Sequence, residues 1–164
     1  MMRPASSVLA ALLGLLLGAC ASTPAAERFS RPNEIRYGAT VQETTAALDG
    51  KCTTLRVRRI DPPFAPEVRR EQLQIDCDGF PFLGAPRWAE FVFRDDSLEM
   101  VWIMLSPDDQ DRTIAAMGAA YGTPTHRNAD YVAFTAQGAA WRFQPAEVLF
   151  YSPAIGSWTL DWFQ

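Results

Sequence analysis

Few side chains in this sequence could carry out nucleophilic or acid–base chemistry, and their spacing does not form a catalytic set. His126 is the only histidine, and it lies in a polar stretch at residues 125–130. A Ser-His-Asp enzyme needs a histidine beside a positioned serine, and the G-x-S-x-G turn that presents such a serine does not occur here. We interpret His126 as an exposed loop residue.

Two clusters of carboxylates could form the acid–base pair of a glycosidase. The first surrounds a predicted turn and the second opens a predicted helix; they consist of Asp95, Asp96 and Glu99, and of Asp108, Asp109 and Asp111. Turns and the positive end of the helix dipole favour aspartate without any catalytic role. The calcium-loop pattern D-x-[DN]-x-[DN]-G is absent from the sequence. We therefore predict no catalytic residue, no metal site and no cofactor.

The first twenty residues have the pattern of an export signal. Arg3 precedes an apolar run at residues 8–17, which is shorter than the roughly twenty residues of a membrane-spanning helix. The segment Leu17-Gly18-Ala19-Cys20 resembles the lipobox of bacterial lipoproteins. The resemblance implies that residues 1–19 are a cleaved signal peptide and that Cys20 is lipidated, which anchors the protein to a membrane.

The residues after the lipobox suggest where the protein is placed. Ala21 is not an aspartate, which in lipoproteins of double-membraned bacteria implies sorting to the outer membrane, facing the periplasm. An ordinary secretory leader with an incidental Cys20 is the alternative. Residues 20–36 are small, polar and proline-containing, which predicts a flexible tether before a domain at residues 37–164.

Charge and cysteine content restrict the function further. Loss of Arg3 with the leader leaves a mature net charge of −5 from the 15 basic and 19 acidic residues, which argues against nucleic acid as a partner. Once Cys20 is assigned to lipid, Cys52 and Cys77 remain, and in an oxidising periplasm this pair predicts a disulfide. A redox or metal pair is the alternative, but the C-x-x-C spacing and further histidines that it would need are missing.

The order of predicted elements indicates an α+β fold. A capping box at Thr40 and Glu43 opens the first helix, and Ser106 followed by Pro107 opens the second. Strand-like runs follow each helix, at residues 54–60, 73–77, 89–93 and 98–105, and at residues 131–135, 140–144, 148–151 and 158–163. We predict an antiparallel sheet with two helices, built either as two tandem helix-plus-four-strand units or as one irregular domain.

This order also resembles the group of exported domains that includes the β-lactamase-inhibitor-protein-like and BamE-like proteins. The matching residues are Gly38-Ala39-Thr40-Val41-Gln42 at the first helix, Tyr121-Gly122-Thr123-Pro124 after the second, and Trp141 in a late strand. Members of that group bind other proteins through sheet surfaces and loops and have no catalysis of their own. The resemblance therefore implies a binding protein.

Two features are candidate interfaces. Trp158 and Trp162 share one face of the last predicted strand, and tryptophan anchors many protein interfaces. Arg56 and Arg58, together with neighbouring arginines across a proline-rich loop, could form a basic patch, with a solvated outer face as the alternative.

We expect a non-enzymatic envelope lipoprotein that binds another envelope protein. A binder or sensor of a small apolar or glycan ligand in an aromatic pocket is the alternative, and a cell-wall hydrolase is the least favoured hypothesis.

Overall fold

The computed structural model describes residues 28–164 of the chain. The predicted leader, the lipobox and Cys20 lie outside the described residues. Within residues 28–164, no helix is long and apolar enough to cross a membrane.

The described part of the chain contains eight strands and three α-helices. The strands are β1 (Thr54–Ile60), β2 (Gln72–Phe82), β3 (Ala85–Arg94), β4 (Ser97–Met104), β5 (His126–Arg127), β6 (Tyr131–Phe134), β7 (Ala139–Arg142) and β8 (Glu147–Tyr151). The helices are α1 (Val41–Ala47), α2 (Gln110–Tyr121) and α3 (Gly156–Leu160), and three 3₁₀ turns are η1 (Pro107–Asp109), η2 (Thr135–Gln137) and η3 (Pro153–Ile155).

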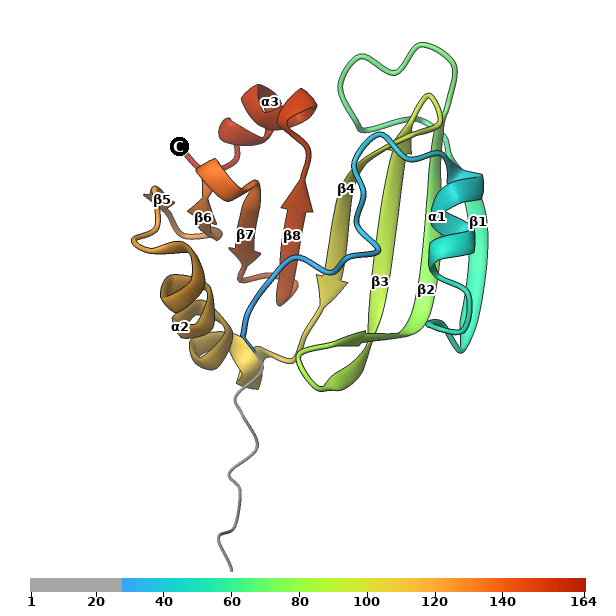
Figure 1. The fold of residues 1–164 in the computed structure, drawn as a ribbon. Coiled ribbons are helices and arrows are strands. Elements are labelled where there is room, and N and C mark those ends of the chain that lie inside the picture. The colour runs from blue at the N-terminus through green and yellow to red at the C-terminus, as the bar shows by residue number, and fades with distance from the viewer. Residues whose placement is uncertain (1–27) are drawn as a thin grey trace, which may run out of the picture.

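All eight strands join one antiparallel sheet in the order β1-β2-β3-β4-β8-β7-β6-β5 (Figure 1). Along the chain α1 precedes β1 to β4 and α2 precedes β5 to β8, so a helix followed by four strands occurs twice. The last strands of the two units pair with each other, from Met100 opposite Tyr151 to Met104 opposite Glu147. The α+β fold class predicted from the sequence is confirmed.

Each face of the sheet carries its own core. Along β3, Ala89, Phe91 and Phe93 point to the first face, which α1, α2 and the amino-terminal segment cover (Figure 1). The second face carries a smaller core, to which Met100 and Phe163 belong, beneath the carboxyl-terminal segment. Because β4 and β8 lie in the middle of the sheet, their residues are buried on both faces, as the apolar run at residues 98–105 predicts.

Both helix starts follow the sequence signals. The Thr40 side chain accepts a hydrogen bond from the Glu43 backbone N–H at 3.2 Å, and the Glu43 carboxylate accepts one from the Thr40 N–H at 2.8 Å. Ser106 caps η1, whose Pro107 stands at the first position, and α2 continues from it. Gly122 ends α2 with a φ of 87°, a conformation that glycine adopts without steric cost.

The first carboxylate cluster stabilises a turn, as the sequence indicates. Asp95 has a φ of 52° in the β3–β4 turn, and its carboxylate accepts backbone hydrogen bonds from Arg69, Arg70 and Glu71. These bonds, led by the one from Arg70, hold the pKa of Asp95 below its usual value. They also tie the long β1–β2 loop to the neighbouring turn.

The predicted disulfide is confirmed. Cys52, which follows α1, bonds to Cys77 in β2, with 5.3 Å between the two Cα atoms. Cys77 points to the first face of the sheet and is fully buried there. The bond therefore ties the first helix to the sheet that it covers.

Two predictions about secondary structure are wrong. Residues 158–163 form α3 and a turn rather than a strand, because β8 already pairs with β4 on one side and β7 on the other. Trp158 and Trp162 are four residues apart, a spacing that also fits one face of a helix. The second unit instead begins with β5, a strand that was not predicted and that contains the half-buried His126, which we expected in an exposed loop.

The predicted tether is also too long at its carboxyl end. Residues 28–36 cross the first face of the sheet, where Phe29 is 4% and Ile35 2% exposed. The Phe29 ring packs against those of Phe82 and Phe150 at centroid distances of 5.9 and 6.0 Å. Burial of these isolated apolar residues fixes the segment, so folded structure begins before residue 37.

Candidate functional site

A cleft of about 590 Å³ opens on the second face of the sheet. We call it the aromatic cleft. It is lined by Phe64, Glu90, Trp102, Met104, Tyr131, Arg142, Pro145, Glu147 and Trp162. Phe64 comes from the β1–β2 loop and Trp162 from the turn after α3, so two segments far apart in the sequence form its sides.

The sheet register places the remaining lining residues next to one another. Glu90 of β3 is opposite Trp102 of β4. Two residues further along β4, Met104 is opposite Glu147 of β8, and Glu147 is opposite Arg142 of β7 on its other side. Side chains on one face recur every second residue, so these two rows form the floor of the cleft.

Aromatic rings form much of the wall. Trp162 stacks on Trp102 at 5.9 Å and on Tyr131 at 6.3 Å between ring centroids. Trp158 packs edge-on behind Trp162 at 4.4 Å. Phe64, on the other side of the cleft, is 47% exposed. The cleft therefore offers both fixed aromatic rings and one ring that remains open to solvent.

A charged pair lies on the floor. The Arg142 guanidinium lies 4.4 Å from the centre of the Trp102 ring and forms an ion pair with Glu147. Glu147 is completely buried, and this burial raises its pKa to about 7; the Glu90 charge acts in the same direction and Arg142 opposes both. Among the described residues, no side-chain or backbone group makes a well-formed hydrogen bond with either Glu147 oxygen or with the Nε of Arg142.

Glu90 is the accessible acid of the cleft, with about a quarter of its side chain exposed. Its Oε1 accepts a hydrogen bond from the Trp88 indole at 3.3 Å and lies 3.8 Å from Arg58. The cleft thus has an acceptor at Glu90 and a donor at Arg142, on opposite sides of the Trp102 ring.

The predicted basic patch is largely neutralised by its own strand neighbours. Arg56 and Arg58 donate to the buried Asp76 carboxylate at 3.0 and 2.8 Å. Burial alone would raise the pKa of Asp76, but hydrogen bonds from Arg58, Gln74 and Arg56 together lower it. These two arginines therefore hold an internal carboxylate and lie beside the aromatic cleft rather than in it.

The tryptophans divide between the core and the surface. Trp141 is fully buried and Trp88 is 39% exposed, whereas Trp158 and Trp162 are half-buried against the second face. Of the predicted interface residues, Trp162 lines the aromatic cleft and Trp158 supports it.

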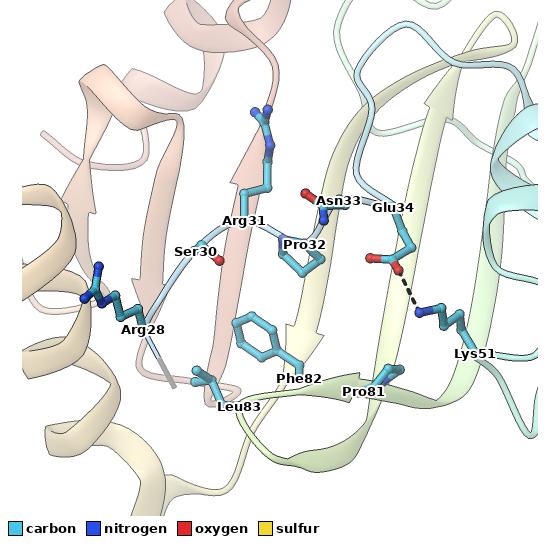
Figure 2. Close-up of a pocket in the computed structure, with 10 residues that line it drawn as sticks. All are labelled: Arg28, Ser30, Arg31, Pro32, Asn33, Glu34, Lys51, Pro81, Phe82 and Leu83. Carbon is cyan, nitrogen blue, oxygen red and sulfur yellow. Dashed lines mark ion pairs between the residues drawn. The ribbon is translucent and has the colours of Figure 1, made fainter. Parts of the chain in front are cut away.

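A second hollow lies on the first face, where residues 28–34 cross the sheet (Figure 2). Glu34 pairs with Lys51 there at 3.1 Å, close to Pro81 of β2, and Leu83 lies at the opposite end of the hollow (Figure 2). A third cavity, beside η2 and α3, contains His126 among its lining residues. In the described part of the chain, no three His, Cys, Asp or Glu side chains group closely enough to hold a metal ion.

Comparisons of this chain with protein-family models, with curated proteins and with solved structures found no match.

Proposed function

We propose that the chain is a lipid-anchored envelope protein that binds a small ligand in the aromatic cleft and has no catalysis of its own. The single observation that carries the proposal is the cleft itself, because aromatic rings surround two carboxylates and an arginine there. Its volume of about 590 Å³ lies within the range of small-molecule sites, which are typically apolar with a few placed polar groups.

The cleft gives the ligand-binding hypothesis more support than the sequence alone did. The protein-binding hypothesis rested in part on a tryptophan-rich strand, whereas Trp158 lies in α3 and Trp162 in the turn after it, and both pack against the second face of the sheet. A contiguous exposed apolar patch is the usual sign of a protein interface. The large apolar residues exposed in the described chain are Val57, Phe64 and Trp88, of which Phe64 lines the aromatic cleft and Trp88 donates a hydrogen bond to Glu90 there.

Ligand binding can be tested on the lipoprotein in lipid nanodiscs, with 5-fluorotryptophan in place of its five tryptophans. Single Trp→Phe variants assign the fluorine signals. The small-molecule fraction of the cell envelope is expected to shift the Trp102 and Trp162 signals and to leave that of the core residue Trp141 in place. The proposal fails if the fraction leaves both cleft signals unchanged.

The lipid anchor is a separate part of the proposal. Residues 28–36 pack against the sheet, so only the seven residues 21–27, or eight Cα–Cα steps, connect Cys20 to Arg28. Fully extended, that stretch spans roughly 28 Å, which would keep the domain close to the outer membrane on its periplasmic side. Labelling with a palmitate analogue is expected in the wild type and not in Cys20→Ala; retained label in the variant would contradict the anchor.

Binding of another envelope protein is the second candidate function, and the edge strand β1 favours it. β1 is the first strand in the sheet order, so no strand of residues 28–164 pairs with one side of its backbone, and Val57 in it is 45% exposed. Exposed edges can accept a strand from a partner. A photo-crosslinker at Val57 would then capture one specific envelope protein, and the same crosslinker at Asp49, beyond α1, would not.

A further inference from the structure

We propose that the ligand of the aromatic cleft is a neutral sugar ring. This inference rests on the proposed ligand-binding function and names the class of molecule that the cleft would take. Its basis is the combination of paired charges, accessible hydrogen-bond donors and acceptors, and aromatic rings in one cleft.

The charges in the cleft already have partners. Arg142 pairs with Glu147, and Arg58 lies 3.8 Å from Glu90. A cationic or anionic ligand would have to compete with one of these arginines or carboxylates for its partner, and its charge would lose hydration without a free counter-charge to replace it. A neutral ligand needs no such exchange.

Hydrogen-bonding capacity is left over in both directions. Arg142, whose side chain is 28% exposed, presents guanidinium donors to the cleft, whereas the Glu147 carboxylate is buried beneath it and pairs with the same guanidinium. Nearer the surface, Glu90 has an accepting carboxylate oxygen, Oε2, to which no hydrogen bond from the described residues is made. A hydroxyl both donates and accepts, whereas an ammonium only donates and a carboxylate only accepts. Adjacent ring hydroxyls therefore match this mixed set best.

The aromatic walls suit the other property of a sugar ring, which is its flat C–H surface. Phe64 and Trp162 stand on two sides of the cleft, and Trp102 lies between the accessible polar groups Glu90 and Arg142. Burying C–H groups against an aromatic ring is favourable in water. The ring would lie with its C–H groups toward the aromatic side chains and its hydroxyls toward Glu90 and Arg142.

Glu147 acts as a positioning residue in this arrangement. It is completely buried, so it does not meet the ligand directly while Arg142 covers it. Its ion pair holds one end of the Arg142 guanidinium, and Trp102 supports the flat side of the same group. Arg142 is thereby oriented before the ligand arrives, which lowers the entropy lost on binding.

The test uses the fluorotryptophan-labelled lipoprotein in nanodiscs and two matched sets of compounds. The sugars are methyl β-glucoside, N-acetylglucosamine and cellobiose. The comparison set keeps a six-membered ring without its hydroxyls: cyclohexylmethanol, cyclohexylmethylamine and cyclohexanecarboxylate. At least one sugar is expected to shift the Trp102 and Trp162 signals saturably, and to bind roughly tenfold more tightly than any cyclohexyl compound, because several hydrogen bonds are added.

Variants then locate the binding. Glu90→Gln is expected to weaken sugar binding roughly tenfold, since the charged acceptor becomes neutral and one of its two oxygens is replaced by a donating amide group. Phe64→Ala is expected to weaken it about two- to tenfold through loss of ring contact. The controls are Asp49→Asn, an exposed acid on the other side of the molecule, and Val57→Ala, which is as exposed as Phe64; neither should change the affinity.

Glu147→Gln tests the positioning role. It is expected to weaken sugar binding at pH 8 by more than at pH 5, because the wild-type acid loses its charge as the pH falls through about 7. An equal loss at both pH values would contradict that role.

Three results would overturn the inference. If a cyclohexyl compound binds as tightly as the best sugar, the sugar inference is wrong and the ligand is apolar or charged instead. The proposed ligand-binding function would not be affected by that result. Sugar binding that is unchanged in both Glu90→Gln and Phe64→Ala would place the sugar elsewhere. If no sugar shifts either cleft signal, the sugar is excluded, and the response to the envelope fraction decides separately whether the cleft binds a ligand at all.

Discussion

Burial of Glu147 makes the stability of the protein depend on pH in a direction opposite to that of most acids. Its pKa rises from 4.5 to about 7 on folding, so between these two pH values the folded protein holds a proton that the unfolded chain has lost. The free energy of unfolding therefore falls as the pH rises from about 4.5 to about 7, and is flat above that. The shift of about 2.5 units corresponds to about 3 kcal/mol.

Glu147→Gln removes this titration and keeps the shape of the side chain. We expect the free energy of unfolding of the wild type, relative to the variant, to fall by about 3 kcal/mol between pH 4.5 and pH 8. Asp76, Asp95 and Asp109 have lowered pKa values, so their contribution is lost only as the pH falls into the acid range. The contribution of these three aspartates cancels when the wild type is compared with Glu147→Gln, because both proteins contain them.

Urea denaturation followed by tryptophan fluorescence measures this difference at pH 4.5, 6 and 8. Asp49→Asn, which changes an exposed acid, is the control and should run parallel to the wild type at all three pH values. A wild-type curve that stays parallel to that of Glu147→Gln from pH 4.5 to pH 8 would refute the idea that Glu147 titrates in a buried site.

Three further predictions concern stability. Replacing Cys52 and Cys77 together by alanine should lower the free energy of unfolding by about 3.5 kcal/mol in the chain-entropy model for 25 residues of separation, and reductant should lower that of the wild type similarly. Thr40→Ala should lower the free energy of unfolding by about 1 kcal/mol, because the α1 cap is lost, and should lower the urea midpoint without changing the slope. Thr45→Ala, further along the helix, should lower it by less. Phe29→Ala should lower the free energy of unfolding by about 3–5 kcal/mol and so lower the urea midpoint. If Phe29 belonged to a flexible tether, the midpoint would not change.

The sequence predicts the elements whose signals are local. The helix caps at Thr40 and Ser106 and the alternation along β1 and β3 depend on neighbours within a few residues, and these elements lie where expected. The central position of β4 is also predictable, because a strand that is apolar on both faces needs cover on both sides.

The elements that were missed depend on distant contacts. Trp158, Leu160 and Trp162 alternate like a strand, but 158 and 162 also fit one helix face, and only the packing of both tryptophans on the second face of the sheet decides between them. Phe29 and Ile35 are single apolar residues in a polar run, so no periodicity marks their burial.

The aromatic cleft could not be assembled from the sequence for the same reason. Its lining residues come from five strands and three connecting segments, and the pairing of β4 with β8 is what brings Trp102, Glu147 and Arg142 together. One signal was available: Glu147 is a lone acid at the start of an otherwise apolar strand. A buried acid needs a charged or hydrogen-bonding partner, so its presence in an apolar strand indicates that other polar side chains lie close to it.

The strand order also gives the sheet two very unequal ends. Each unit places its first strand outermost, but β1 has seven residues and β5 only two. An added strand can form a ladder along β1 and finds almost no backbone to pair with along β5. Two molecules that join through β1 would therefore use up the one long edge of the sheet formed by residues 28–164 of each, so association through these edges ends at a closed pair and does not extend into a fibre.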